Sequence, residues 1–267
     1  MSAVLHTTGV SVSFGGVRAL VDVDLDVEEG RLVGLIGPNG AGKTTFIDAI
    51  SGFVPFRGSV ELDGRDISKL KPHRRARLGL SRTWQSIELF DDLTVAENLT
   101  VAAYRPSVLT TVKEVVSRAV VGTGATDAAL ELLGIESMRD AMPSELTQGQ
   151  RKLVGIARSL ATEPRVICLD EPAAGLDTRE STELATRLRQ VVDAGTSMLL
   201  VDHDMGLVLG ISDHVVVLEF GKVIASGPPE QVRRDPQVVA AYLGGAAAEA
   251  APGVEAAAQA VVEGAEG

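Results

Sequence analysis

The sequence predicts an α/β fold: a mainly parallel sheet with flanking helices, together with a small antiparallel β-subdomain and an inserted helical subdomain. Short apolar runs recur along the chain with helical patterns between them. Strands that alternate with helices form parallel sheets with crossover helices. The first residues instead alternate between apolar and polar, and a long helical stretch interrupts the middle of the chain. With 267 residues, 45% of them apolar, the chain can bury a sizeable core.

The N-terminal part reads as strands separated by turns. Between residues 9 and 26, apolar residues alternate with serines and acids, which is typical of strands with one solvent-facing side. Residues 32–36, LVGLI, are apolar without alternation, as in a parallel strand that is buried on both faces. Val60 and Leu62 precede Asp63-Gly64, a strong tight-turn signal. We therefore expect a small antiparallel sheet beside the main one.

The rest of the chain alternates helical and strand patterns. Residues 92–141 carry apolar residues at helical spacing, which predicts the inserted helical lobe. Three further apolar runs, at 166–169 (VICL), 198–201 (MLLV) and 215–218 (VVVL), predict strands of the main sheet. Cys168 lies inside the first of these runs, and we expect it to be a small buried apolar residue.

Three parts of the chain follow from these patterns. We expect a core with its antiparallel β-subdomain at residues 1–85 and 162–245, and a helical subdomain at 86–161. Residues 246–267 are Ala-rich and contain four Glu but no Lys or Arg. That composition predicts a disordered tail, because it cannot bury enough apolar surface to fold.

The overall charge excludes several classes of partner. The chain has 25 Lys and Arg against 36 Asp and Glu, a net charge of −11, which argues against nonspecific binding to nucleic acid or to anionic membranes. The single cysteine excludes an internal disulfide, and no CxxC pair offers zinc ligands. No run approaches about 18 apolar residues, so we expect the chain to serve a membrane only through a partner.

One stretch is locally basic. It contains six cationic residues within residues 69–82: Lys69, Lys71, Arg74, Arg75, Arg77 and Arg82. Such a stretch could bind nucleic acid or lipid headgroups, or it could be a solvated helix that begins at Pro72. We favour the solvated helix and expect no nucleic-acid partner, because the protein is acidic and poor in aromatic residues.

The clearest chemical signal is the segment GPNGAGKTT, which directly follows the LVGLI strand. It matches the phosphate-loop pattern G-x-x-x-x-G-K-[ST] at Gly37, Gly42, Lys43 and Thr44. Glycines let backbone amides converge on phosphate oxygens at the positive end of the following helix. The alternative is a glycine-rich turn that binds nothing. The strand before and the helix after favour a P-loop NTPase core.

The pattern assigns a role to each part of this loop. Lys43 would reach the β- and γ-phosphates, and the Thr44 hydroxyl would ligate Mg²⁺. The expected nucleotide-binding residues are Gly37, Pro38, Asn39, Gly40, Ala41, Gly42, Lys43, Thr44 and Thr45.

Four further elements accompany the phosphate loop. They are VICLDEP at 166–172, AGLD at 174–177, LTQGQ at 146–150, and His203 after the MLLV strand. Together with the loop they resemble the nucleotide-binding subunit of ABC transporters, over about residues 10–244. The resemblance implies an ATPase that uses ATP and Mg²⁺, with residues 86–161 carrying the family's signature motif.

The resemblance assigns catalytic roles to two adjacent acids. Asp170 would hold Mg²⁺, and Glu171 would position the attacking water or accept its proton. Side chains of neighbouring strand residues face opposite ways, so both acids reach one site only if the strand ends there. A free Glu has a pKa of about 4.3 and is a weak base at neutral pH, so we expect Glu171 to act chiefly by orientation.

Three isolated residues also match family positions. Gln85 corresponds to the glutamine that senses the γ-phosphate and contacts the metal beside Thr44 and Asp170. His203 corresponds to the histidine that contacts the γ-phosphate. Phe14 lies where the family places an aromatic ring on adenine, although a buried Phe on a strand is the alternative.

The signature segment departs from the usual LSGGQ of the family. Thr147 replaces Ser and keeps a hydroxyl, whereas Gln148 replaces the first Gly, so its side chain must point away from the nucleotide. The resemblance implies that Thr147, Gly149 and Gln150 of one subunit complete the ATP site of another. It also implies that Asp177 contributes at that shared interface. A second ATP-binding subunit, identical or related, is therefore an expected partner.

Three segments indicate a branch of the family. Residues 73–85, 89–99 and 227–244 are similar to the ATP-binding subunits of branched-chain amino-acid importers. This implies transmembrane permease subunits as partners, a solute-binding protein as an indirect one, and a location at the cytoplasmic face of the cell membrane. Cassettes for urea, short amides or lipids remain alternatives. So do a soluble ABC ATPase that acts outside transport and a nucleotide-binding module that does not hydrolyse ATP.

Overall fold

The computed structural model describes residues 3–83, 88–103 and 123–246. Within them, a six-stranded sheet has the order β10-β9-β3-β8-β7-β6. Its strands are β3 (Leu32–Ile36), β6 (Leu80–Arg82), β7 (Val166–Asp170), β8 (Ser197–Val201), β9 (His214–Glu219) and β10 (Lys222–Gly227). All neighbours pair in parallel except β9 and β10. The predicted, mainly parallel sheet is confirmed, and β6 and β10 add an unpredicted strand at each edge.

A second, antiparallel sheet lies beside the first, as predicted. Its order is β2-β1-β4-β5, with β1 (Ala3–Phe14), β2 (Val17–Glu28), β4 (Arg57–Leu62) and β5 (Arg65–Asp66). Buried and exposed residues alternate along β2, so one face of the strand is apolar and the other acidic. The Asp63-Gly64 turn joins β4 to β5.

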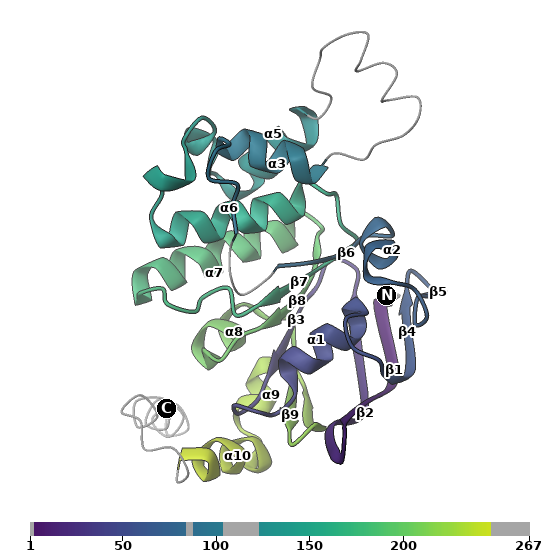
Figure 1. Ribbon diagram of the computed structural model, residues 1–267. Helices are drawn as coiled ribbons and strands as arrows, with labels where there is room; N and C mark the ends of the chain where they lie inside the picture. The colour runs from purple at the N-terminus through teal and green to yellow at the C-terminus, as the bar shows by residue number, and fades with distance from the viewer. Residues whose placement is uncertain (1–2, 84–87, 104–122, 247–267) are drawn as a thin grey trace.

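The helices are distributed over both faces of the six-stranded sheet. They are α1 (Lys43–Ser51), α2 (Pro72–Arg77), α3 (Val95–Ala103), α5 (Thr123–Leu133), α6 (Gln148–Leu160), α7 (Thr178–Asp193), α8 (Met205–Ile211), α9 (Pro229–Arg233) and α10 (Pro236–Ala246), with 3₁₀ turns at Glu136–Met138 and Pro143–Glu145. Figure 1 shows α6 and α7 on one side of this sheet and α1 on the other, beside β1, β2 and β4.

Strand alternation gives the protein two hydrophobic cores. On β3, Val33 and Leu35 pack toward α1 and the antiparallel sheet, whereas Leu32 and Ile36 pack toward α6, α7 and α8. The same alternation recurs on β7, where Ile167 joins the helical side. The central sheet is therefore the middle layer of three. Its parallel strands have their carboxyl ends along one edge of the sheet, which is called the carboxyl edge below. Ligands of α/β sheets bind at that edge.

Cys168 lies at the centre of β7 and is fully buried, as the sequence predicts. Burial raises the pKa of its thiol to about 12.

The helices α3, α5 and α6 pack on one another, and α5 and α6 also contact α7. This group accounts for the helical pattern of residues 92–141, except that 104–122 lie outside the described residues. The boundaries at 85/86 and 161/162 stay a prediction, as does the tail, which lies outside the description from residue 247 onward. None of the described helices combines the length and the apolarity that a bilayer span requires.

The prediction of a solvated basic stretch is wrong for two of its members. A helix does begin at Pro72, but Arg75 on it is only 2% exposed. Its guanidinium donates hydrogen bonds to four carbonyl oxygens, those of Ala49, Ile50, Ser68 and Leu70. Arg82 lies beyond the helix, in β6, and its side chain is 8% exposed. The buried positions of both arginines were not evident from a run of similar charges.

Replacing Arg75 by Met is expected to lower the free energy of unfolding by about 3 kcal/mol, because hydrogen bonds from a charged donor are lost and buried carbonyls lose a partner. Two of those carbonyls, on Ala49 and Ile50, belong to the last turn of α1, where a cation also offsets the helix dipole. Urea unfolding followed by circular dichroism measures the change. Arg74→Met, at an exposed position of the same helix, is the control; equal losses in both variants would contradict the role of Arg75.

Candidate functional site

The glycine loop between β3 and α1 has a backbone that only glycine tolerates at two positions. Gly42, the N-cap of α1, has φ 104°, and a Cβ there would lie 2.7 Å from the carbonyl oxygen of Ala19. Gly37 has φ 150°, and a Cβ there would lie 2.1 Å from the carbonyl oxygen of Leu218. The loop is thus pressed against β2 and the β9–β10 hairpin. Its outer residues Asn39 and Gly40 are exposed.

Lys43 lies beneath this loop rather than in solvent. Its side chain is buried, and Nζ donates hydrogen bonds to the carbonyl oxygens of Gly37 (2.6 Å) and Pro38 (3.1 Å). Burial lowers the pKa of Lys43, and the negative charges of Glu171 and Asp170 oppose that shift. The structure therefore brings together the three charged residues that the sequence assigned to one site. The ammonium has three N–H donors and gives two of them to these carbonyls, so the third can meet a phosphate oxygen.

The residues after Lys43 occupy the first turn of α1. Thr44 is exposed and Thr45 is half-buried, while Ala41 is buried and Pro38 is half-buried. The unpaired amides of a helix N-terminus attract anions. This turn therefore presents amides and hydroxyls where the sequence places phosphates.

The two adjacent acids lie on either side of the end of a strand. Asp170 is the last residue of β7, and its side chain is buried. Glu171 has φ 49°, and its amide donates to the carbonyl oxygen of Val201 at 2.7 Å, so the backbone leaves the strand at this residue. The condition for both acids to reach one site is met. Burial raises the pKa of Asp170, and the charge of Arg82 opposes the shift.

A third acid, Asp202, lies at the carboxyl ends of the parallel strands beside Asp170 and was not predicted as a site residue. It follows β8, is fully buried, and accepts hydrogen bonds from the amides of Ala173 and Asp204, both at 3.0 Å. It therefore ties the turn after β7 to the turn after β8. An acid directly after an apolar strand was the signal that could have found it. His203 follows it with a side chain 58% exposed and Nδ1 3.4 Å from the Asp202 carboxylate.

A buried lysine on α6 joins the carboxyl edge as well. The side chain of Lys152 is buried, and Nζ donates to the carbonyl oxygen of Pro172 at 2.8 Å. Burial lowers the pKa of Lys152, and the charges of Asp202 and Glu171 oppose the shift. The helical group is thereby fastened to the turn that carries Glu171. Nothing in the sequence singles out Lys152, because a lysine in a helix is ordinarily solvated.

The signature segment forms the start of α6. Thr147 is the N-cap: its Oγ1 accepts a hydrogen bond from the Gln150 amide at 3.2 Å, and Gln150 Oε1 accepts one from the Thr147 amide at 2.9 Å. This reciprocal capping box fixes the first turn of the helix. The side chain of Gln148 lies against the backbone of Gly175, where an added Cβ would come within 2.9 Å of its Nε2.

The start of α7 lies next to the signature segment. Asp177 is its N-cap and accepts a hydrogen bond from the Glu180 amide at 2.8 Å, while the Glu180 carboxylate accepts one from the Asp177 amide at 3.2 Å. A Cβ on Gly149 would lie 2.9 Å from Oε1 of Glu180, so glycine lets the two helix starts approach. Asp177 and the signature residues therefore belong to one packed surface of this chain.

The two remaining predicted residues have different outcomes. Phe14 lies at the end of β1 and is 51% exposed, so the alternative of a buried core ring is excluded. Its contact with adenine stays a prediction. Gln85 lies outside the described residues, between β6 and the helical group.

The donors at the carboxyl edge fit magnesium in kind. Among the described residues, no cluster of three or more His, Cys, Asp or Glu could hold a metal ion alone. Magnesium in nucleotide enzymes does not need one, because it is held by one or two protein oxygens together with phosphates and waters. The Thr44 hydroxyl at the start of α1 and the buried carboxylate of Asp170 are oxygen donors of that kind.

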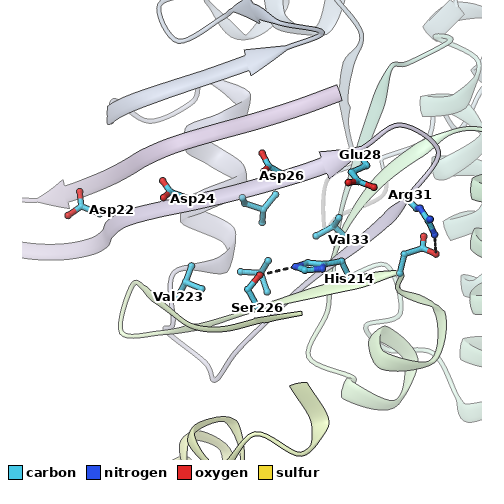
Figure 2. Close-up of a pocket in the computed structure, with 12 residues that line it drawn as sticks. Asp22, Asp24, Asp26, Glu28, Arg31, Val33, His214, Val223 and Ser226 are labelled. Carbon is cyan, nitrogen blue, oxygen red and sulfur yellow. Dashed lines mark hydrogen bonds and ion pairs between the residues drawn. The ribbon is translucent and has the colours of Figure 1, made fainter. Parts of the chain in front are cut away.

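A separate cavity of about 680 Å³ lies between β2 and the β9–β10 hairpin. Figure 2 shows Asp22, Asp24, Asp26 and Glu28 along one wall and His214 bound to Ser226 opposite. This acidic wall would repel a triphosphate. The cavity is therefore not the nucleotide site.

The phosphate loop and the charged residues at the carboxyl ends of the parallel strands define the class of protein. Amides that converge between a central strand and a helix, with a lysine under the loop, are the device by which P-loop NTPases hold nucleotide phosphates. Comparison with known families agrees: the ABC transporter family model matches residues 20–174, and the model of the branched-chain amino acid ATP-binding cassette transporter matches residues 222–248. The chain belongs to the ABC transporter family and is one of its ATP-binding, ATP-hydrolysing subunits.

Similar proteins align over nearly the whole chain. The high-affinity branched-chain amino acid transport ATP-binding protein BraF of Pseudomonas aeruginosa is 38% identical over 249 residues, which cover 90% of this chain and 98% of BraF. LivG of Escherichia coli K12, with the same description, is 37% identical over 255 residues, covering 90% of this chain and 97% of LivG.

Solved structures agree on the fold. A nucleotide-free ATP-binding cassette of an ABC transporter superposes with a TM-score of 0.78 at 30% identity, over 90% of this chain and 99% of the other. The ADP conformation of such a cassette also gives a TM-score of 0.78 at 30% identity, over 91% of this chain and 100% of the other.

Proposed function

We propose that this subunit hydrolyses ATP to energise the import of branched-chain or other hydrophobic amino acids through separate permease subunits. The observation that carries the ATPase site is Lys43, buried under the glycine loop and within the electrostatic reach of Asp170 and Glu171. The branched-chain solute rests on the relatives and on the match of residues 222–248.

The residues divide the work of phosphoryl transfer between positioning and charge stabilisation. Backbone amides of residues 37–45, apart from Pro38, which has no N–H, bind the phosphates. The Lys43 ammonium has three N–H donors for its two carbonyl partners and adds a phosphate oxygen. Magnesium, when bound, neutralises charge on the phosphates, and Thr44, Gln85 and Asp170 would hold it.

The remaining groups act on the water and on the base. Glu171 orients the attacking water, and the exposed imidazole of His203 contacts the γ-phosphate. The exposed ring of Phe14 stacks on adenine.

Each site is completed by a second ATP-binding subunit, identical or related. Thr147, which is exposed, and Gly149 and Gln150, which are half-buried, lie at the start of α6, where they can meet the phosphates held by the opposite subunit. Asp177 lies beside them, so a closing dimer would engage both helix starts together. Closure on ATP and opening after hydrolysis would then move the permeases at the cytoplasmic face of the membrane. A solute-binding protein would deliver the amino acid from the other side.

Affinity purification tests the transport role. The tagged subunit, extracted from membranes in mild detergent, is expected to carry integral permease subunits, identified by mass spectrometry. Recovery on ribosomes or DNA instead would contradict it and favour a soluble ABC ATPase. The reconstituted complex with its solute-binding protein should take up labelled leucine on ATP addition. Uptake of urea, amides or lipids but not leucine would move the subunit to one of the related cassettes.

A further inference from the structure

One buried cation of the site has no role in the account above. Arg82 ends β6, the strand at the edge of the six-stranded sheet that pairs with β7 (Figure 1). Its Nη1 lies 2.5 Å from Oδ1 of Asp48, and its Nη2 lies 3.0 Å from Oδ2 of Asp170. The guanidinium also lies over the ring of Phe53, 5.8 Å from its centroid. The side chains of Arg82 and Asp170 are only 8% and 5% exposed.

This geometry joins three elements of the ATP site. Asp48 is on α1, the helix that begins at Lys43, and Asp170 is the last residue of β7. A planar guanidinium can bond two carboxylates at once, one from each terminal nitrogen, which a lysine ammonium cannot do with the same fixed orientation. Within the described part of the chain, the Asp170 carboxylate accepts a hydrogen bond from Arg82 alone, through Oδ2.

We propose that Arg82 is a positioning residue for Asp170: by holding Oδ2 it fixes the orientation of the carboxylate that would hold the metal of the bound nucleotide. The proposal rests on the metal-binding role of Asp170 proposed above. Partners that orient metal-binding carboxylates typically change metal affinity by about 10- to 100-fold when they are removed. A purely structural ion pair would change stability and leave metal affinity as it was.

Metal binding itself, without turnover, tests the proposal. Mn²⁺ serves as the probe, and free Mn²⁺ is measured by electron paramagnetic resonance in the presence of the full-length subunit and a non-hydrolysable ATP analogue. Arg82→Gln is expected to weaken Mn²⁺ binding at least about tenfold. Affinity for the analogue in EDTA should stay within about twofold, because Arg82 contacts carboxylates rather than the phosphate loop. Arg77→Gln, at an exposed position of the same basic stretch, should change neither value.

Two further variants keep the test sharp. Arg82→Lys retains the charge and is expected to fold even if the Gln variant does not, yet to bind Mn²⁺ more weakly than wild type because it loses the fork. Asp170→Asn is the reference, and thermal unfolding verifies that each variant is folded. Wild-type Mn²⁺ affinity in folded Arg82 variants, alongside weakened binding in Asp170→Asn, would overturn the proposal for Arg82 alone. Wild-type affinity in Asp170→Asn would instead refute the proposed role of Asp170.

Discussion

Replacing Glu171 by Gln is expected to reduce ATP turnover by at least about 100-fold while ATP binding is retained, the range found when a general base or water-orienting group is lost. The amide has the shape of the carboxylate, and the backbone that places residue 171 is fixed independently by its hydrogen bond to Val201. Binding without hydrolysis should also accumulate the closed dimer. Phosphate release gives kcat and KM, and size-exclusion chromatography with ATP and Mg²⁺ detects the dimer.

Glu163 offers a matched control for this experiment. It is also a glutamate in the left-handed region, with φ 50°, but it is exposed and precedes β7 rather than following it. Glu163→Gln should leave turnover at the wild-type rate. An unchanged rate in Glu171→Gln would refute the role assigned to that carboxylate, and equal losses in both variants would point to a general effect on the fold.

Replacing Lys43 by Ala is expected to weaken ATP binding by about 10- to 100-fold, the cost of losing a charged hydrogen-bond donor to an anion. The loss should be present with and without Mg²⁺, because Lys43 acts on the phosphates directly. Isothermal titration calorimetry measures the affinity. Lys222→Ala, an exposed lysine on β10, is the control for net charge.

Because Lys43 is buried, its replacement can also change the stability of the loop, and this must be measured separately. Without nucleotide, its ammonium donates hydrogen bonds to the carbonyls of Gly37 and Pro38, so the alanine variant also loses two hydrogen bonds inside the loop. Thermal unfolding without nucleotide separates that effect from the loss of a phosphate contact. Wild-type affinity for ATP with Mg²⁺ in a folded Lys43→Ala protein would contradict the phosphate-loop assignment.

The sequence predicted those parts of the protein whose physics is local. Residues 32–36 could be assigned as a doubly buried strand because all five are apolar, and the phosphate loop because its glycines and Lys43 have a fixed spacing. The sequence shows that Asp170 and Glu171 can share a site only if the strand ends between them, but it does not show that the strand ends there. The left-handed backbone at Glu171 provides that end. Each of these features depends on fewer than ten consecutive residues.

The parts that escaped prediction depend on contacts between distant residues. Arg82 meets partners 34 and 88 positions away, and the three-residue strand that holds it is too short to give a periodic pattern. Arg75 resembles a solvated charge because the residues next to it in the sequence do not indicate that its guanidinium binds the carbonyls at the end of α1. Asp202 looked like one more polar residue after a strand, and only the folded turns show that it joins them.

The burial of Cys168 makes the natural protein a convenient host for chemical labelling. Maleimides and spin labels react with the thiolate, and a thiol with a pKa of about 12 in the middle of β7 is neither ionised nor accessible at neutral pH. A cysteine introduced at an exposed position would therefore be the sole reactive one without any prior removal of Cys168. Distance probes attached in this way could follow opening and closing of the assembly during the ATP cycle.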